Sequence, residues 1–356
     1  MDYKLLYGEE NRNSVFNLRI KNREGEIRET PSRAFKKVSF NFDKKYFTEL
    51  MISIKNDELK GKPNYPKFDE NIERKLKKKE VKNNVNIISF YGDKNTDINN
   101  LVKFEDLGLL SNFETLFNDH LITMPYSLSL YDSSLDEIYQ QVTNSFDTFF
   151  TTLTSKNLFG YVPAYVKYGE IDKFINFYSG KSLGTVNENE TKYNAIPLLI
   201  DLKRSAPDSF MRSIAMLHQL KIKYMAEGYY PIYYAANVSR PRTSDKKQRT
   251  LAKEFMLAFL GFDIIGASHA VHPKEGKGGG GEGNFFDFDL GTFSYIKTGN
   301  KGNTYKTDKS KAEIFSTQTS YLNLIHNNTL TDTKYLENEF NKRKEAKDYV
   351  DTINGQ

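Results

Sequence analysis

The stretch NAIPLLIDLKRSAPDSFMRSIAMLHQLKIKYMAEGYYPIYYAANV, which runs from Asn194 to Val238, contains two apolar runs separated by a helix-like segment. NAIPLLIDL and YPIYYAANV are continuous and apolar, as strands covered on both faces of a parallel sheet are. The segment between them, APDSFMRSIAMLHQLKIKYMAEG, has amphipathic helical spacing and ends at Gly228. The stretch therefore predicts a strand–helix–strand unit.

The same alternation extends along the chain in both directions. Further strand-like runs lie near residues 38, 87, 121, 159, 264 and 286, which brings the strand candidates to about eight. One of the intervening helices has Ser133 or Ser134 as its predicted cap, with Asp136 and Glu137 in its first turn. Such units form either a closed barrel or an open doubly wound sheet. No glycine fingerprint follows the first strand, so the pattern favours an α/β fold of the (β/α)8 barrel type.

The predicted barrel is one domain over residues 1–330 with a basic insertion near 55–84, and a polar helix follows over 331–356. The insertion, which includes NIERKLKKKEVKNN, is read either as a solvated surface segment or as an arm that contacts phosphates.

The composition limits the class of protein. The chain has 356 residues, of which 38% are hydrophobic and 27% charged, so it can build a core and a polar surface. It contains no Cys, which excludes disulfides and thiolate metal sites. No apolar run is long enough for a membrane span and no signal peptide is recognised, so we expect a cytoplasmic protein without a membrane partner. The net charge of +5 permits a nucleic-acid partner without requiring one.

In a barrel of this type the functional residues lie at the carboxyl ends of the strands. Asp201 is predicted to be a catalytic carboxylate there, although an ion pair with Lys203 or Arg204 is the alternative reading. Ser239 is read either as a substrate contact or as a turn or cap residue. The residues predicted to bind substrate at this rim are Tyr126, Tyr165, Lys203, Asn237, Ser239, Arg240, Arg242, Ser268, His269 and His272.

The segment GFDIIGASHAVHPKEGKGGGGEG, Gly261 to Gly283, places two of the five histidines beside a glycine run. His269 and His272 are spaced for a metal, but no third ligand is fixed among the nearby acids, so no metal is predicted. The glycine run lacks the Lys-Ser/Thr ending of a nucleotide-binding loop. It is read as a lid or as a plain surface loop, and no cofactor is predicted.

Five segments carry a resemblance to a known family, over about 150 residues in patches: PIYYAANV, LAFLGFDIIGASHAVHPK, NLFGYVPAYV, NAIPLLIDLK and REGEIRETPSRAF. They are similar, in the same order, to segments of the archaeal type of tRNA-guanine transglycosylase. The resemblance implies a barrel that exchanges guanine for a 7-deazaguanine base in DNA or tRNA through a covalent Asp–ribose intermediate.

The resemblance also implies roles for individual residues. When the chain is aligned with the family on GFD, Asp263 occupies the position of the nucleophile. When it is aligned on ASHAVHPK, Ile265 occupies that position, and an isoleucine side chain cannot act as a nucleophile. Asp93 or Asp119 could supply the family's second Asp, and Asp201, chosen for its place at a strand end, is the second carboxylate that we predict. Tyr126 would be a stacking platform, and Lys203, Arg240 and Arg242 would be phosphate contacts. The family's Thr-Asp-Ser-Gly motif and its Cys-rich zinc site are absent from the sequence.

Three functions remain open from the sequence. The first is base exchange in DNA or tRNA. The second is a catalytically inactive barrel that binds nucleic acid or an active partner subunit, as a homo- or hetero-oligomer. The third is an enzyme acting on a phosphorylated small molecule.

Overall fold

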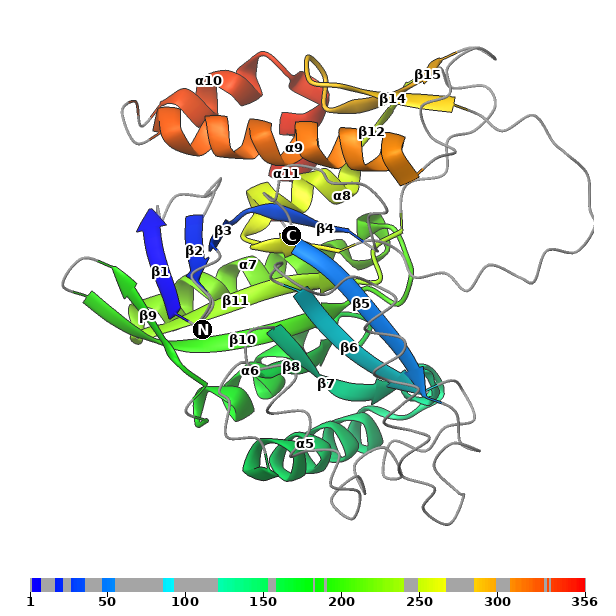
Figure 1. Ribbon diagram of the computed structural model, residues 1–356, viewed down its shortest axis with the longest axis vertical. Coiled ribbons are helices and arrows are strands. Elements are labelled where there is room, and N and C mark those ends of the chain that lie inside the picture. Colours follow the sequence, from blue (N-terminus) through cyan, green and yellow to red (C-terminus); the bar gives the residue numbers. More distant parts are fainter. Residues whose placement is uncertain are drawn as a thin grey trace, which may run out of the picture.

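The computed structural model describes residues 2–7, 17–21, 27–35, 47–54, 86–92, 121–152, 158–181, 183–188, 191–239, 249–266, 285–298, 308–329, 332 and 334–355. Figure 1 shows how the helices and strands formed by these residues are arranged.

Eight parallel strands close into a barrel, which confirms the predicted (β/α)8 fold. Each strand pairs in parallel with the next one around the ring, and the last pairs with the first. In order around the barrel they are β4 (Ser32–Phe35), β5 (Phe47–Ile54), β6 (Asn86–Gly92), β7 (Leu121–Ser127), β8 (Leu158–Pro163), β10 (Thr191–Asp201), β11 (Tyr229–Ala236) and β13 (Ile264–Ile265).

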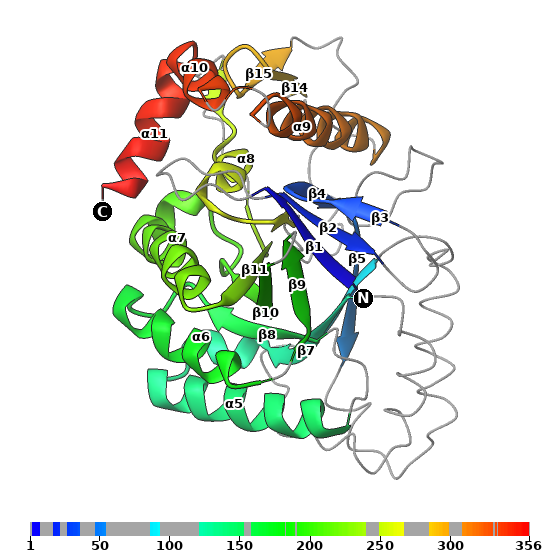
Figure 2. The ribbon, with the colours of Figure 1, turned by 90° about the vertical axis from the view of Figure 1, so that its left-hand side faces the viewer.

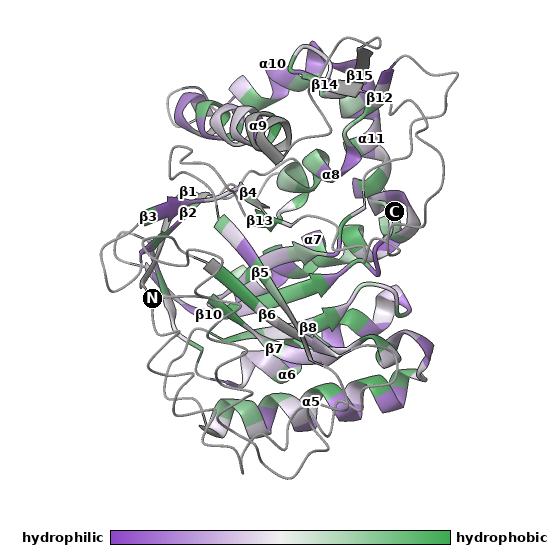
Figure 3. Cartoon of the chain, turned by 45° about the vertical axis from the view of Figure 1, so that its right-hand side comes forward, coloured by the Kyte–Doolittle hydropathy of each residue, from purple (hydrophilic) through white to green (hydrophobic). Residues whose placement is uncertain are grey.

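Helices follow the strands and cover the outside of the barrel. The described ones between barrel strands are α5 (Leu135–Thr152), α6 (Ile171–Ser179), α7 (Met211–Ala226) and α8 (Lys253–Met256). In α5, Ser134 and Glu137 form a reciprocal capping box, which confirms one of the two predicted caps. Figures 2 and 3 show α5, α6 and α7 along the barrel, whose strands are mainly hydrophobic while the helices also carry hydrophilic residues.

A small sheet extends from the amino end of β10. There β9 (Thr185–Glu188) pairs antiparallel with β10, and beyond it follow β1 (Asp2–Tyr7), β2 (Asn17–Lys21) and β3 (Ile27–Glu29). Because this extension begins at the amino end of β10, the carboxyl ends of the barrel strands lie away from it.

The C-terminal part packs against the barrel as a separate layer (Figure 1). It contains α9 (Asp308–Thr329), α10 (Tyr335–Asn341), α11 (Lys344–Asn354) and a sheet of β12 (Arg249–Leu251), β15 (Ser294–Thr298) and β14 (Phe285–Asp289). The buried Arg33 on β4 joins the layers, because its backbone N–H bonds to Thr319 and its guanidinium lies 4.1 Å from the ring centre of Phe315.

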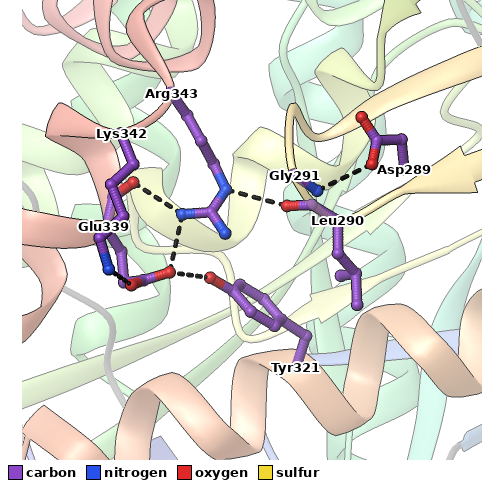
Figure 4. Close-up of polar contacts among 7 residues, drawn as sticks. All are labelled: Asp289, Leu290, Gly291, Tyr321, Glu339, Lys342 and Arg343. Carbon is purple, nitrogen blue, oxygen red and sulfur yellow. Dashed lines mark hydrogen bonds and ion pairs between the residues drawn. The ribbon is translucent and has the colours of Figure 1, made fainter.

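Arg343 fixes the turn between β14 and β15 to the helices (Figure 4). It donates to the backbone carbonyl of Leu290 at 2.9 Å and to the carboxylate of Glu339 at 2.7 Å. Tyr321 of α9 donates to the same carboxylate. Since Arg343 and Glu339 are largely buried and mutually satisfied, this group is a structural clamp.

Two strand predictions differ from the structure. The run near residue 286 is β14, which lies outside the barrel in the three-stranded sheet. The eighth barrel strand is instead β5, at residues 47–54, whose apolar run is interrupted by Glu49. The strand expected near residue 38 is β4, whose described residues end at Phe35. None of the helices in the described ranges is long and apolar enough to cross a membrane.

Candidate functional site

Asp201 is the last residue of β10 and is fully buried at the carboxyl end of the barrel. Its Oδ2 accepts a hydrogen bond of 2.6 Å from the Tyr161 hydroxyl on β8. Its Oδ1 accepts from the Lys203 backbone N–H at 3.0 Å, from Asn237 Nδ2 at 2.9 Å and from the Tyr131 hydroxyl at 3.3 Å. The barrel thus gathers donors from the ends of several strands around one carboxylate.

Aromatic rings surround this carboxylate. Tyr126 on β7 stacks on Tyr161 with ring centres 5.0 Å apart, and its hydroxyl accepts from Asn237 at 3.3 Å. Tyr165 meets Tyr161 hydroxyl to hydroxyl at 3.1 Å and packs edge-on against Tyr131. Tyr126 and Tyr161 are buried, whereas Tyr131 and Tyr165 are partly exposed. The cluster therefore leads from the buried carboxylate to the surface.

The position of Tyr161 is fixed from outside the barrel. Tyr178 of α6 accepts a hydrogen bond from the Tyr161 backbone N–H at 2.9 Å and donates to its carbonyl at 3.0 Å. Gly160 permits this contact, since a Cβ there would lie 2.4 Å from the Tyr178 ring. The residues Leu-Phe-Gly-Tyr of β8 thus set the direction of the Tyr161 side chain.

The backbone around Asp201 is strained. Lys203, Arg204 and Asn237 have positive φ angles of 48°, 57° and 56°, which non-glycine residues rarely adopt. Such conformations persist where the surroundings enforce them, and they cluster at functional sites. In this structure they hold the Lys203 N–H and the Asn237 amide against Asp201.

Burial controls the protonation of the cluster. It raises the pKa of Asp201 above its ordinary value, although the hydrogen bonds from Tyr161, Asn237 and Lys203 oppose the rise. Burial and the Asp201 charge also raise the pKa of Tyr126, Tyr131, Tyr161 and Tyr165, so the phenols are protonated. Of the groups in this cluster, the Asp201 carboxyl is therefore the one that can give and take up a proton.

Lys203 lies beside the tyrosines instead of pairing with Asp201 through its side chain. Its ammonium donates to the Tyr131 carbonyl at 3.0 Å and lies 5.2 Å from the ring centres of both Tyr131 and Tyr165. Ser239 ties two loops together, because its hydroxyl donates to the Arg204 carbonyl at 2.6 Å. Arg240, Arg242, Ser268, His269 and His272 lie outside the described residues.

Asp263, the predicted nucleophile, is not brought together with Asp201. It precedes β13 and is fully buried, and its carboxylate pairs with Lys221 of α7 at 2.7 Å. It also accepts from the Tyr233 backbone N–H at 2.7 Å and from the Tyr230 hydroxyl at 3.2 Å. Since α7 packs outside the barrel, this carboxylate is held on the helix side of the sheet.

A buried histidine on α7 makes stability depend on pH. Burial and the nearby Lys221 charge lower the pKa of His218 from 6.5 to about 4. The folded state binds this proton less well than the unfolded chain, so stability falls as the pH drops from 6.5 toward 4. We expect His218 to account for a loss of about 3 kcal/mol at most. Urea unfolding at several pH values measures it, and an equal loss in His218→Leu would contradict the assignment.

The sequence did not single out a second buried carboxylate, Glu49 of β5. Its Oε1 accepts a hydrogen bond of 2.5 Å from Tyr234 of β11. Because β13 and β4 separate these strands in the ring, the contact crosses the barrel interior. The charges of Glu49 and Asp201 both raise the pKa of Tyr234, after burial, so the two carboxylates share one polar interior.

Gly266, which follows β13, makes room for Glu49. A Cβ at this position would lie 2.1 Å from Glu49 Oε1 and 2.8 Å from the Ala235 carbonyl. We therefore expect Gly266→Ala to lower the free energy of unfolding by about 1–3 kcal/mol, because a backbone atom as well as a side chain must shift. Gly169→Ala is the control, since a Cβ there meets nothing within 4 Å. Equal denaturation midpoints for both variants would show that the space at Gly266 is not needed.

The described acids and histidines include no group of three or more that could hold a metal ion. Tyr161, Tyr234 and Glu49 were missed because they lie inside strands, where nothing distinguishes them from core residues. Tyr131 was missed because it lies four residues beyond the end of β7, in the short helix Leu128–Asp132. Comparisons of the chain with protein-family models, with curated proteins and with solved structures find no match.

Proposed function

We propose that this protein exchanges guanine for a 7-deazaguanine base in DNA or tRNA, with Asp201 as the carboxylate that binds the base and moves its proton. The observation that carries the proposal is the buried Asp201 in a cage of tyrosines at the carboxyl end of the barrel. A carboxylate accepts hydrogen bonds from the N–H groups of a guanine edge, and tyrosine rings stack on a flipped base.

The chemistry requires a group that gives and recovers one proton. The leaving guanine takes both electrons of its bond to the sugar C1′ and gains a proton. The incoming base loses a proton as its own bond to C1′ forms, so the exchange balances. A carboxyl group whose pKa is raised by burial, as that of Asp201 is, suits this role.

A cation next to Asp201 supports an anionic substrate. Arg204 is partly exposed in the turn after β10, although its Nε is a buried atom without a hydrogen-bond partner among the described residues. A guanidinium in this position suits a phosphate of the nucleic acid. Lys203, by contrast, already holds the Tyr131 carbonyl.

A second function is favoured by the state of Asp263. The covalent Asp263–ribose intermediate that the sequence resemblance implies would require this residue to leave its pair with Lys221. A barrel without turnover, which binds nucleic acid or serves an active partner subunit, needs no such step.

Incorporation of labelled guanine into DNA and into tRNA by the purified chain separates the two functions. We expect exchange into one of the two nucleic acids. Salt-dependent binding to both without exchange would support the non-catalytic function instead. Failure to bind either would exclude base exchange and direct nucleic-acid binding, and would leave a partner-subunit role or an enzyme acting on a phosphorylated small molecule.

A further inference from the structure

The two oxygens of Asp201 differ in their contacts. Oδ1 accepts three hydrogen bonds, from Lys203, Asn237 and Tyr131, whereas Oδ2 accepts one from the Tyr161 hydroxyl within the described chain. A carboxylate oxygen has about two acceptor sites, so Oδ1 is already saturated. When Asp201 takes up a proton, the proton therefore resides on Oδ2, facing Tyr161.

A chain of hydroxyls connects Oδ2 with the surface. The Tyr161 hydroxyl lies 2.6 Å from Oδ2, which is in the range of strong hydrogen bonds to a carboxylate. Tyr165 continues the chain at 3.1 Å, and either of the two hydroxyls can donate. Tyr161 is fully buried and Tyr165 is partly exposed, so the chain leads outward.

The alternative route through Tyr131 is poorer. Its hydroxyl lies 3.3 Å from Oδ1, beyond the usual range for a hydrogen bond between two oxygens. It also approaches the oxygen that two shorter hydrogen bonds already occupy. Tyr131 and Tyr165 are otherwise alike, since both are partly exposed and both rings face the Lys203 ammonium.

We infer that Asp201 exchanges its proton with solvent through Tyr161 and Tyr165. In uptake, the Tyr161 proton moves to Oδ2, the Tyr165 proton moves to the Tyr161 oxygen, and a hydronium ion of the bulk solvent gives a proton to Tyr165 and becomes water. One proton enters and none is left on an intermediate. The direction reverses when Asp201 releases its proton.

The charged groups around the chain favour such a concerted transfer. Lys203 lies against Tyr165 and Tyr131, and Arg204 acts on Tyr126 from the same turn. These cations would repel a free hydronium ion inside the cluster. In a concerted transfer each hydroxyl gives up one proton as it gains another, so no hydroxyl carries a net charge. Among the described residues, Tyr126 and Asn237 beside Asp201 are neutral, and the Glu49 carboxylate in the same barrel interior is bonded to Tyr234.

The role of this Tyr161–Tyr165 relay in base exchange rests on the proposed function. The proton transfer itself can be measured without substrate. The probe is the infrared band of the protonated Asp201 carboxyl after a rapid pH jump, assigned by its loss in Asp201→Asn. We expect Tyr165→Phe to slow protonation by about tenfold or more. The matched control, Tyr131→Phe, should stay close to the wild-type rate, and thermal unfolding should show both variants folded.

The protonation rates of the two variants decide whether the relay exists. An unchanged rate in Tyr165→Phe, or an equal slowing in Tyr131→Phe, overturns the relay. A slowed rate in Tyr165→Phe alone supports it, even if the protein exchanges no guanine, in which case the proposed function fails and the relay stands. If the protein exchanges guanine but Tyr165→Phe protonates Asp201 at the wild-type rate, the proposed function stands and the relay fails.

Discussion

Replacing Lys221 with methionine is expected to lower the free energy of unfolding by about 3–5 kcal/mol. Both Lys221 and Asp263 are fully buried, and their charged atoms are 2.7 Å apart. Methionine would leave the Asp263 carboxylate buried without a counter-ion and would also deprive the Gly261 carbonyl of its donor at 2.8 Å. Denaturant unfolding monitored by circular dichroism measures the loss.

Two controls isolate the buried pair. Lys223→Met, on the same helix, breaks an ion pair with Asp172 whose members are 48% and 40% exposed, and should cost about 1 kcal/mol or less. The double variant Lys221→Met with Asp263→Leu should recover most of the loss, since no unpaired charge remains. If Lys221→Met and Lys223→Met prove equally stable, the pair does not stabilise the fold as described.

Replacing Asp201 with asparagine is expected to reduce guanine exchange by at least about 100-fold. The amide cannot carry the exchanging proton, and its NH2 group would face donors such as Tyr161 or Asn237. The rate of labelled-guanine incorporation is measured per folded molecule, because the substitution also disturbs a buried network.

Asp172→Asn is the matched control, since Asp172 is a partly exposed carboxylate bonded to Lys223 and Tyr224 on the outer helices. It should retain wild-type exchange. Asp263→Asn gives the complementary comparison: exchange that persists in the folded fraction assigns the chemistry to Asp201, whereas exchange lost only in Asp263→Asn would assign it to Asp263.

The barrel could be predicted because most of its strands read as uninterrupted apolar runs. β10 and β11 are buried over their length from Ala195 to Asp201 and from Tyr230 to Ala236. β5 was not predicted because Glu49 interrupts its apolar run, and the contact of Glu49 with Tyr234 joins strands that are far apart in the sequence. β14 was counted as a barrel strand, although the exposed Asp287 beside the buried Phe288 is typical of a sheet with one covered face.

The site could be predicted in part for a related reason. Asp201, Tyr126, Tyr165 and Asn237 were found by the rule that functional residues follow barrel strands, and the structure places them in one cluster. The surroundings of Asp263 could not be predicted, because its partner Lys221 lies 42 residues earlier on a helix. Tyr161 was missed because nothing in an apolar run shows which tyrosine meets a carboxylate.

The binding of labelled guanine to the wild-type protein and to Asp201→Asn, measured by equilibrium dialysis, shows directly whether Asp201 lies at the centre of a base-binding site. We expect one saturable guanine site per chain in the wild type and its loss in the folded variant. Equal binding by both proteins, or no binding by the wild type, would contradict the claim that Asp201 is the centre of a base-binding site.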